Sequence, residues 1–227
     1  MIVAIDGPAG SGKSTVARGA ARRLGFAYLD SGAMYRVVTL LALEGELDLE
    51  DSDALGRLAE GLSIELRERE HAYVQVLVDG RDVTAEIRAP RVTGASSTVA
   101  ALPEVRRALL AKQRELIDSR DSVVEGRDIG TVVAPAAPVK LFLTADPSER
   151  ARRRAAELER QGLRAEAADV RDAIEQRDRL DSTRSAAPLR PADDAVVIDT
   201  TSLDAGEVIE RVVALVRDAR KHEEDPR

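Results

Sequence analysis

The chain has 227 residues, of which 44% are hydrophobic, and its formal net charge is −7. This composition suffices for a hydrophobic core, and the acidic balance argues against a non-specific nucleic-acid partner or an anionic membrane surface. The absence of cysteine excludes disulfides, thiolate metal sites and a cysteine nucleophile. No stretch approaches the ~20 apolar residues of a transmembrane helix, and an apolar segment at residue 2 leaves no room for a signal peptide. We therefore expect a globular, cytoplasmic protein.

The most informative stretch lies at the N-terminus. An apolar segment at residues 2–5 leads into G-P-A-G-S-G-K-S at residues 7–14, and a helical pattern follows over residues 15–24. A strand, G-x-x-x-x-G-K-S and a helix form the context of a phosphate-binding loop, in which backbone N–H groups surround phosphate oxygens. Lys13 would then meet the β- and γ-phosphates, and the Ser14 hydroxyl could hold Mg²⁺. The motif predicts an ATP site formed by Gly7, Pro8, Ala9, Gly10, Ser11, Gly12, Lys13, Ser14 and Thr15.

A second strand and helix follow at residues 26–30 and 33–43. The order strand, helix, strand, helix predicts a parallel sheet with crossover helices. Ser31, Tyr35 and Arg36 follow the second strand, at the sheet edge where α/β proteins bind ligands. From these residues alone, Tyr35 is equally well explained as a partly buried helix residue and Arg36 as a solvated one.

The hydrophobic period changes in the middle of the chain. A weakly amphipathic helix at residues 48–62 is followed by alternation at residues 64–66 and a β-rich run at residues 73–78, which ends in Asp79-Gly80. These features predict a small antiparallel unit with a tight turn, inserted into the α/β chain. A long helix is expected from Pro103 to residue 119, and the arginines on its polar face ordinarily indicate only solvation.

The parallel sheet resumes at residues 122–128, S-V-V-E-G-R-D. Glu125, at the end of this buried strand, is a candidate for orienting Mg²⁺ or its waters. Gly126 allows Arg127 and Asp128 to crowd the sheet edge. Another strand is expected at residues 138–143. The helix after it carries four arginines at positions 150–154. Either a bound anion or the neighbouring glutamates could offset the repulsion between these arginines.

The last part of the chain completes the sheet. If residues 177–184 are helical, Arg177, Asp181 and Arg184 share one face, either as a ligand site or as an ion-pair ladder. A fifth parallel strand is expected at residues 195–199, followed by a closing helix at residues 203–217. We expect residues 221–227 to be a disordered tail.

Four motifs in this order resemble those of bacterial cytidylate kinases: I-D-G-P-A-G-S-G-K-S, L-D-S-G-A-M-Y-R, V-E-G-R-D-I-G-T and R-D-R-L-D-S-T-R-S-A-A-P-L. The resemblance covers residues 2–216. It implies an α/β P-loop kinase with a five-stranded parallel sheet flanked by helices, a small antiparallel and helical insert for a nucleoside monophosphate, and a short helical lid. It also implies transfer of the γ-phosphoryl group of ATP to CMP or dCMP with Mg²⁺. Glu125 departs from the shorter Asp of some relatives, and the lid is rich in Ala and Arg.

The resemblance implies a division of the chain as well: a core at residues 1–61, 103–149 and 166–220, an insert at 62–102, a lid at 150–165 and a tail at 221–227. Nothing in the sequence indicates a dimer interface, so we expect a monomer that binds small molecules, without a nucleic-acid or membrane partner.

Individual roles are carried over by resemblance. The expected catalytic residues are Lys13, Arg127, Arg153, Arg154 and Arg184. The expected CMP-binding residues are Ser31, Tyr35, Arg36, Ser97, Arg106, Arg127, Asp128, Arg177, Asp181 and Arg184. Within this set Ser97, Arg106 and Asp128 would recognise cytosine, and Arg177 and Asp181 would reach the sugar. Ser14 and Glu125, the latter through water, would hold the metal.

Two other classes of protein share part of this pattern. A P-loop kinase for another nucleotide, a sugar acid or shikimate would keep the loop and the lid but has no reason to carry Asp181 and Arg184. The second alternative is an ATP- or GTP-driven switch or motor. The chain contains no asparagine, so it has neither the N-K-x-D guanine motif nor a protein-kinase H-R-D-x-x-x-x-N loop.

Overall fold

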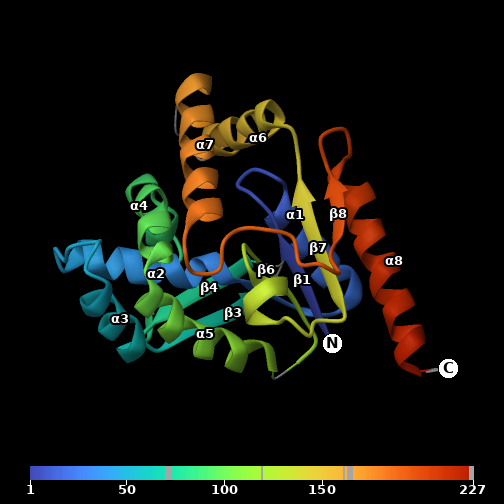
Figure 1. The fold of residues 1–227 in the computed structure, drawn as a ribbon, viewed down its shortest axis with the longest axis horizontal. Coiled ribbons are helices and arrows are strands. Elements are labelled where there is room, and N and C mark those ends of the chain that lie inside the picture. The colour runs from blue at the N-terminus through green and yellow to red at the C-terminus, as the bar shows by residue number, and fades with distance from the viewer. Residues whose placement is uncertain (70–72, 119, 161, 163–165, 225–227) are drawn as a thin grey trace.

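The computed structural model describes residues 1–69, 73–118, 120–160, 162 and 166–224. Its centre is a five-stranded sheet in which all neighbouring strands run parallel, with the order β2-β6-β1-β7-β8 (Figure 1). The strands are β1 (Ile2–Asp6), β2 (Ala27–Asp30), β6 (Ser122–Gly126), β7 (Val139–Thr144) and β8 (Val196–Asp199). The predicted five-stranded parallel sheet is therefore confirmed.

Both faces of the central strands are buried, which explains why these strands are continuously apolar in sequence. Val3 and Ile5 of β1 point to the face that is covered by α1 (Lys13–Leu24) and α8 (Ala205–Glu224). Ala4, between them, belongs to a second cluster on the opposite face, with the π-helical turn Ile129–Val133. The alternation of a strand's side chains thus divides the core into two layers.

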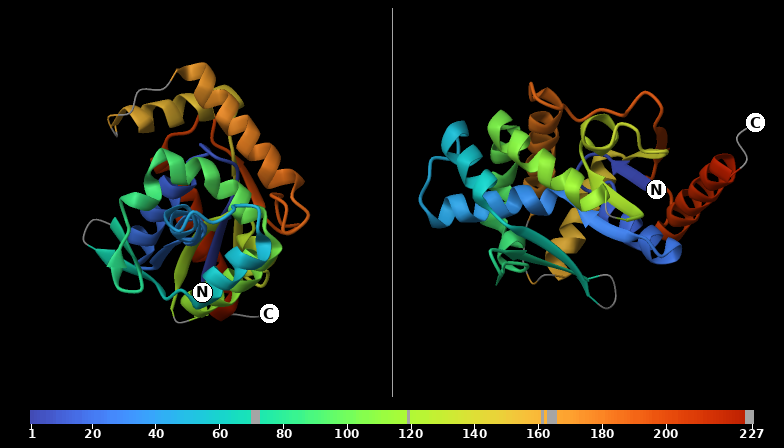
Figure 2. Two further views of the ribbon diagram at one scale, coloured as in Figure 1. Left: turned by 90° about the vertical axis from the view of Figure 1, so that its left-hand side faces the viewer. Right: turned by 90° about the horizontal axis from the view of Figure 1, so that it is seen from below.

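A second sheet lies apart from α8, on the side of the molecule where α3 (Ser52–Gly61) and α4 (Pro90–Ala101) are found (Figure 2). This sheet is antiparallel, in the order β3-β4-β5, and is made of β3 (Ile64–Arg69), β4 (Tyr73–Val78) and β5 (Arg81–Asp82). Asp79 and Gly80 both have positive φ, 49° and 81°, as a tight two-residue hairpin turn requires. The predicted turn at these two residues is confirmed.

Four helices surround this antiparallel sheet and the neighbouring end of the core: α2 (Ser31–Glu44), α3 (Ser52–Gly61), α4 (Pro90–Ala101) and α5 (Pro103–Asp118). The sequence pattern predicts no individual helix at residues 90–101, whose glycine, threonine and valine are weak helix formers. The helix begins with Pro90 in its first turn and buries Val92 and Val99 in the main core. Tertiary packing, rather than local propensity, stabilises α4.

The C-terminal third contributes α6 (Pro147–Arg160) and α7 (Ala167–Thr183), which pack against each other at one edge of the molecule (Figures 1 and 2). α7 ends just before Arg184, so Arg184 is not part of the helix. The last helix, α8, continues to Glu224 and packs on α1. The expected disordered tail was therefore wrong for residues 221–224, which extend this helix, whereas residues 225–227 lie outside the described residues.

Candidate active site

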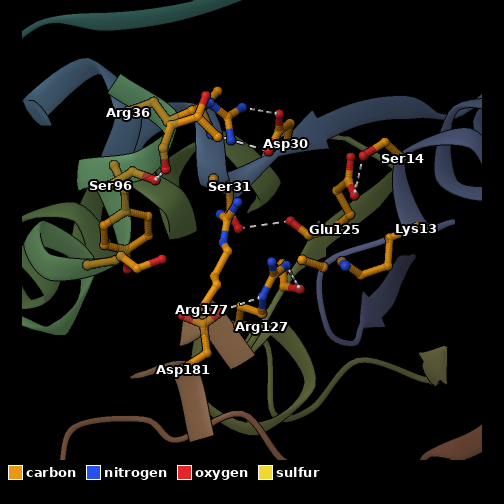
Figure 3. A pocket seen from close by; sticks show the side chains of 18 of the residues that line it. Lys13, Ser14, Asp30, Ser31, Arg36, Ser96, Glu125, Arg127, Arg177 and Asp181 are labelled. Carbon is orange, nitrogen blue, oxygen red and sulfur yellow. Dashed lines mark hydrogen bonds and ion pairs between the residues drawn. The ribbon is translucent and has the colours of Figure 1, made fainter. Parts of the chain in front are cut away.

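A cavity of about 310 Å³ lies at the carboxyl ends of β1, β2 and β6. The phosphate loop forms one of its walls, and residues from α2, α4, α5, α6 and α7 form the others (Figure 3). Sixteen of the residues singled out from sequence line it: Ala9, Gly10, Lys13, Ser14, Ser31, Tyr35, Arg36, Ser97, Arg106, Glu125, Arg127, Asp128, Arg154, Arg177, Asp181 and Arg184. The fold thus brings most of the expected site into one place.

The phosphate loop takes its shape from its glycines. Gly7, Gly10 and Gly12 have φ values of 149°, 75° and 89°, which side chains rarely tolerate. At Gly7 a Cβ atom would also lie 2.1 Å from the carbonyl oxygen of Leu143 on β7. The loop is therefore pressed against the sheet, and α1 begins at Lys13 with its N-terminus at the cavity.

Lys13 is held inside this loop. Its Nζ donates to the carbonyl oxygen of Pro8 at 2.6 Å, and the residue is 6% exposed. Burial, reinforced by the positive charge of Arg127, lowers the pKa of Lys13 to about 7. An anion bound beside Nζ would reverse this effect, because an opposite charge favours the ammonium form.

Ser14 and Glu125 meet at the same edge. The Ser14 hydroxyl donates to Oε2 of Glu125 at 2.9 Å, and the Tyr28 hydroxyl donates to the other carboxylate oxygen. Burial, followed by the charge of Asp30, raises the pKa of Glu125 above its usual range. Among the residues that the structure describes, no group of three or more His, Cys, Asp or Glu could hold a metal ion. A hydroxyl beside one carboxylate suits Mg²⁺, which keeps several waters and is bound mainly through substrate phosphates.

The opposite wall is rich in arginine. Arg36, Arg127, Arg154, Arg177 and Arg184 all line the cavity. Two ion pairs hold part of this charge: Arg36 Nη2 to Asp30 Oδ2 at 2.6 Å, and Arg127 Nε to Asp181 Oδ2 at 2.8 Å. Figure 3 shows Arg127 and Arg177 pointing into the space between Asp181 and Glu125.

Three guanidinium nitrogens of this wall are buried without a hydrogen-bond partner among the described residues: Arg36 Nε, Arg177 Nε and Arg184 Nη2. Burial, together with the charge of Arg127, lowers the pKa of Arg177 to about 10. Buried donors without partners are costly unless a ligand satisfies them. The wall is therefore built to receive an anion with several oxygen atoms.

A third group of residues lies beyond the arginines, next to the insert. Arg106 forms an ion pair with Asp128 through Nη2, donates from Nη1 to the Ala100 carbonyl at 3.0 Å, and lies over the Tyr35 ring at 5.4 Å. Ser97, on α4, is 6% exposed and lines the same part of the cavity. The ring, the guanidinium and the carboxylate together offer a flat contact and both kinds of hydrogen-bonding group.

Arg153 does not line the cavity, unlike the other expected residue of its helix, Arg154. Its guanidinium donates to Glu149, and to Oγ1 and the carbonyl oxygen of Thr200 at 2.9 and 2.6 Å. A Cβ on Gly12 would nevertheless lie only 3.8 Å from Arg153 Nη1, so the side chain is next to the loop. The remaining expected loop residues, Gly7, Pro8, Ser11, Gly12 and Thr15, also lie outside the cavity lining, although Pro8 and Ser11 take part in the loop's internal bonds.

Several lining residues were not singled out from sequence, among them Arg18, Tyr28, Asp30 and Arg88. Asp30 caps α2 by accepting from the Ala33 N–H at 3.2 Å while it pairs with Arg36. The aspartate before S-G-A-M is a recognisable N-cap signal, so this residue could have been found. Arg88 follows the antiparallel sheet and donates to the Thr84 carbonyl at 2.5 Å; no local signal distinguishes it from a surface arginine.

A parallel sheet that carries a phosphate loop at the end of β1, facing an arginine-lined cavity, defines the class of P-loop kinases. Residues 3–218 match the family model for cytidylate kinase, and the chain belongs to this family.

Individual relatives agree with this assignment. The chain is 48% identical to a cytidylate kinase of Pelotomaculum thermopropionicum, over 96% of this chain and 97% of the relative. It is 50% identical to a cytidylate kinase of Geobacillus kaustophilus, over 95% and 96%. A crystal structure of an uncharacterized protein from Eubacterium ventriosum shares the fold, with a TM-score of 0.54, 11% identity, and coverage of 96% of this chain and 98% of that one.

Proposed function

We propose that this chain is a nucleoside monophosphate kinase that transfers the γ-phosphoryl group of ATP to CMP or dCMP, giving ADP and CDP or dCDP. The observation that carries the proposal is one cavity with a phosphate loop on one wall and, on the other, arginines whose buried nitrogens lack hydrogen-bond partners among the residues described (Figure 3). Membership of the cytidylate kinase family supports cytidine as the nucleoside of the acceptor.

The loop wall would bind the donor. The backbone N–H groups of the loop and the positive end of α1 attract the phosphates of ATP, and Lys13 adds its charge between the β- and γ-phosphates. Ser14 and Glu125 would hold Mg²⁺, with Glu125 acting through water. When bound, Mg²⁺ neutralises charge on the phosphate oxygens.

The arginine wall would bind the acceptor. Arg36, Arg127 and Arg184 are the groups expected to hold the phosphate of CMP, and Arg36 and Arg184 each carry a buried nitrogen that lacks a hydrogen-bond partner within the described part of the chain. Phosphoryl transfer proceeds through a loose transition state, so a protein contributes positioning and positive charge rather than a nucleophile. Arginines fixed on both sides of the transferred group meet that requirement, with Arg154 of α6 on the same cavity.

Arg177 and Asp181 would contact the sugar. Asp181 is buried at 4% exposure, and the charges of Arg127 and Arg177 outweigh the effect of burial and keep its pKa below the usual range. It is therefore a permanent acceptor, suited to a sugar hydroxyl.

Ser97, Arg106 and Asp128 are the proposed cytosine-recognition residues. Cytosine presents an amino donor beside two acceptors, N3 and O2, and a carboxylate with a guanidinium complements this set. Uracil would place its O4 against the carboxylate and its N3–H against a donor, leaving polar groups unpaired at about 1–3 kcal/mol each. The buried Arg106–Asp128 pair supplies a donor and an acceptor group side by side in the cavity wall.

The chain's other expected properties remain predictions. Among the described residues, no helix is both long enough and apolar enough to cross a lipid bilayer. The proposed substrates are small molecules, and we expect the chain to act as a cytoplasmic monomer. The lid at residues 150–165 and the insert at residues 62–102 are proposed to close over the two substrates and exclude water.

A coupled assay of ADP release over a panel of acceptors tests the proposal. We expect turnover with CMP and dCMP, at least about 10²-fold weaker turnover with UMP, and none with gluconate or shikimate. Turnover that is independent of any acceptor would indicate a switch or motor. Turnover with shikimate or gluconate but not with CMP would indicate another small-molecule kinase.

A further inference from the structure

The tip of the phosphate loop is bound by two side chains that do not line the cavity. The Ala9 N–H donates to Oδ1 of Asp178 on α7 at 3.2 Å. The Ala9 carbonyl oxygen accepts from Nη1 of Arg150 on α6, also at 3.2 Å. Both backbone polar groups of one loop residue are thus satisfied from outside the loop.

Arg150 and Asp178 are also bound to each other. The same Nη1 forms an ion pair with Oδ2 of Asp178, and Arg150 Nε donates to the Ala145 carbonyl at 3.1 Å. The side chains are 9% and 21% exposed, respectively, so the pair is largely shielded from solvent. Charge-assisted bonds in such surroundings hold their partners in a defined geometry.

Packing reinforces the polar contacts. Ala9 lies against the small apolar cluster between α6 and α7, formed by Ala151, Val170 and Ile174. The next residue, Gly10, is so close to α6 that a Cβ atom would lie 2.7 Å from the carbonyl oxygen of Arg150. The loop tip is therefore seated in the junction of the two helices.

The helix that supplies Asp178 also supplies acceptor-side residues. Arg177 precedes Asp178 directly, and Asp181 follows it by three residues, and both line the cavity. Asp178 thus connects the phosphate loop to the helix that carries part of the opposite wall.

We propose that Asp178 and Arg150 are positioning residues for ATP, which hold Ala9 and with it the phosphate loop in its binding shape against α7. The inference rests on the proposed function. We call the Arg150–Asp178 pair, with its bonds to Ala9, the clasp. A loop that is ordered in advance loses less conformational entropy when it binds phosphates, so the clasp strengthens ATP binding. The clasp bonds Ala9 and not the residues proposed to hold CMP, Arg177 and Asp181 of the same helix included, so the affinity for CMP depends little on it.

Two substitutions and one control variant test the clasp. Asp178→Ala removes both bonds of the carboxylate. Asp178→Asn keeps an oxygen acceptor for the Ala9 N–H but loses the charge. Asp172→Ala alters an exposed aspartate of the same helix and serves as the control. For each protein, calorimetry gives the Kd of ATP and of CMP separately, and NMR gives the hydrogen-exchange rate of the Ala9 amide.

We expect Asp178→Ala to weaken ATP binding about tenfold, to accelerate exchange at Ala9, and to change the Kd of CMP by less than about twofold. Asp178→Asn should fall between this variant and the wild type in both ATP affinity and Ala9 exchange. The control should match the wild type. Should Asp178→Ala fail to fold, Asp178→Asn and Arg150→Gln replace it. Both variants should weaken ATP binding and accelerate exchange at Ala9, with little change in the Kd of CMP.

Three results would overturn the proposal: unchanged ATP affinity, weaker ATP binding with unchanged exchange at Ala9, or an equal loss of affinity for CMP. None of these measurements needs phosphoryl transfer. A wild-type protein that binds ATP but does not phosphorylate CMP would contradict the proposed function. The ATP affinity and Ala9 exchange of the variants would still test the role of the clasp.

Discussion

The two walls of the cavity are built in different ways. The loop wall comes from one short run of residues, and its geometry is a property of the backbone, set by glycines such as Gly10 and Gly12 with positive φ. The arginine wall is assembled from three separate segments: α2 carries Arg36, the end of β6 is followed by Arg127, and α7 with the residue after it supplies Arg177 and Arg184. The polar groups of the loop wall are bonded within the loop and by Asp178 and Arg150, whereas the arginine wall has buried nitrogens that lack a hydrogen-bond partner among the described residues. The shape of the donor site thus comes mainly from local sequence, supported at Ala9 by α6 and α7, and the acceptor site depends on the tertiary fold throughout.

The largest effect should follow from removing the charge of the loop wall. We expect Lys13→Ala to lower kcat by at least about 10²-fold, because charge on the β- and γ-phosphates loses its fixed partner in a site with little water. Steady-state kinetics with saturating CMP measures this. Near-wild-type turnover would mean that the loop wall does not bind the donor.

The second prediction sharpens the role of the other wall. Asp128→Ala should erode a CMP-over-UMP preference of about 10²-fold, chiefly by lowering kcat/KM for CMP rather than by raising it for UMP. Ser97→Ala is measured alongside. Equal losses for both substrates in both variants would show that Asp128 only orients its arginine partners and that cytosine is recognised elsewhere.

The predictability of the two walls differs for the same physical reason. The loop could be assigned from eight consecutive residues, because its glycine spacing and the flanking strand and helix are local features. The arginine wall could be assigned only by resemblance, since nothing local distinguishes Arg36 or Arg177 from a solvated helix residue. The pairing of Arg106 with Asp128 depends on where α5 lies relative to the end of β6.

The same distinction explains the errors in the fold. The sheet and the hairpin turn follow from periodicity and turn chemistry, and both were predicted. α4 depends on burial of Val92 and Val99 rather than on propensity, and the end of α8 extends past Lys221 although that segment is highly charged. Arg153 and Arg154 were both assigned to the lid by resemblance; consecutive helix residues point in different directions, and in this structure Arg153 is bound to Thr200 while Arg154 lines the cavity.

That contrast within α6 leads to the third prediction. Arg154→Ala should lower kcat about tenfold with little change in the Kd of CMP, because a lid contact forms mainly as the site closes. Arg153→Ala should likewise affect kcat more than CMP affinity. Comparable losses in CMP binding by calorimetry, without a loss of kcat, would move these arginines to the acceptor site. Arg152→Ala, on the exposed side of α6, is the matched control.

The smallest expected effect is the uptake of a proton when ATP binds. Burial holds the pKa of Lys13 at about 7, below its ordinary 10.5, so the free protein carries a largely neutral lysine at about pH 8. Phosphates raise this pKa, and ATP binding should therefore take up a fraction of a proton, up to about one, at that pH. Calorimetry in buffers of different ionisation enthalpy measures the uptake. Lys13→Met should abolish it, and an unchanged uptake in that variant would assign the proton to another group.

The lowered pKa of Lys13 also affects the folding stability of the free protein. Because the folded pKa of Lys13 is lowered, the unfolded chain binds more protons between about pH 7 and pH 10.5, and this lysine's penalty on stability disappears as the pH rises through that window. Below about pH 7 the penalty is fully present. The difference in unfolding free energy between wild type and Lys13→Met should therefore narrow from pH 7 to pH 10.

The central claim is that one cavity holds ATP and CMP end to end, with the loop on one phosphate chain and the arginines on the other. A bisubstrate molecule, adenosine and cytidine joined through five phosphates, tests it in one titration by calorimetry. We expect one molecule to bind per chain, at least about 10²-fold more tightly than ATP or CMP alone, because the second contact becomes intramolecular. Affinity no better than that of ATP, or two molecules bound per chain, would contradict it.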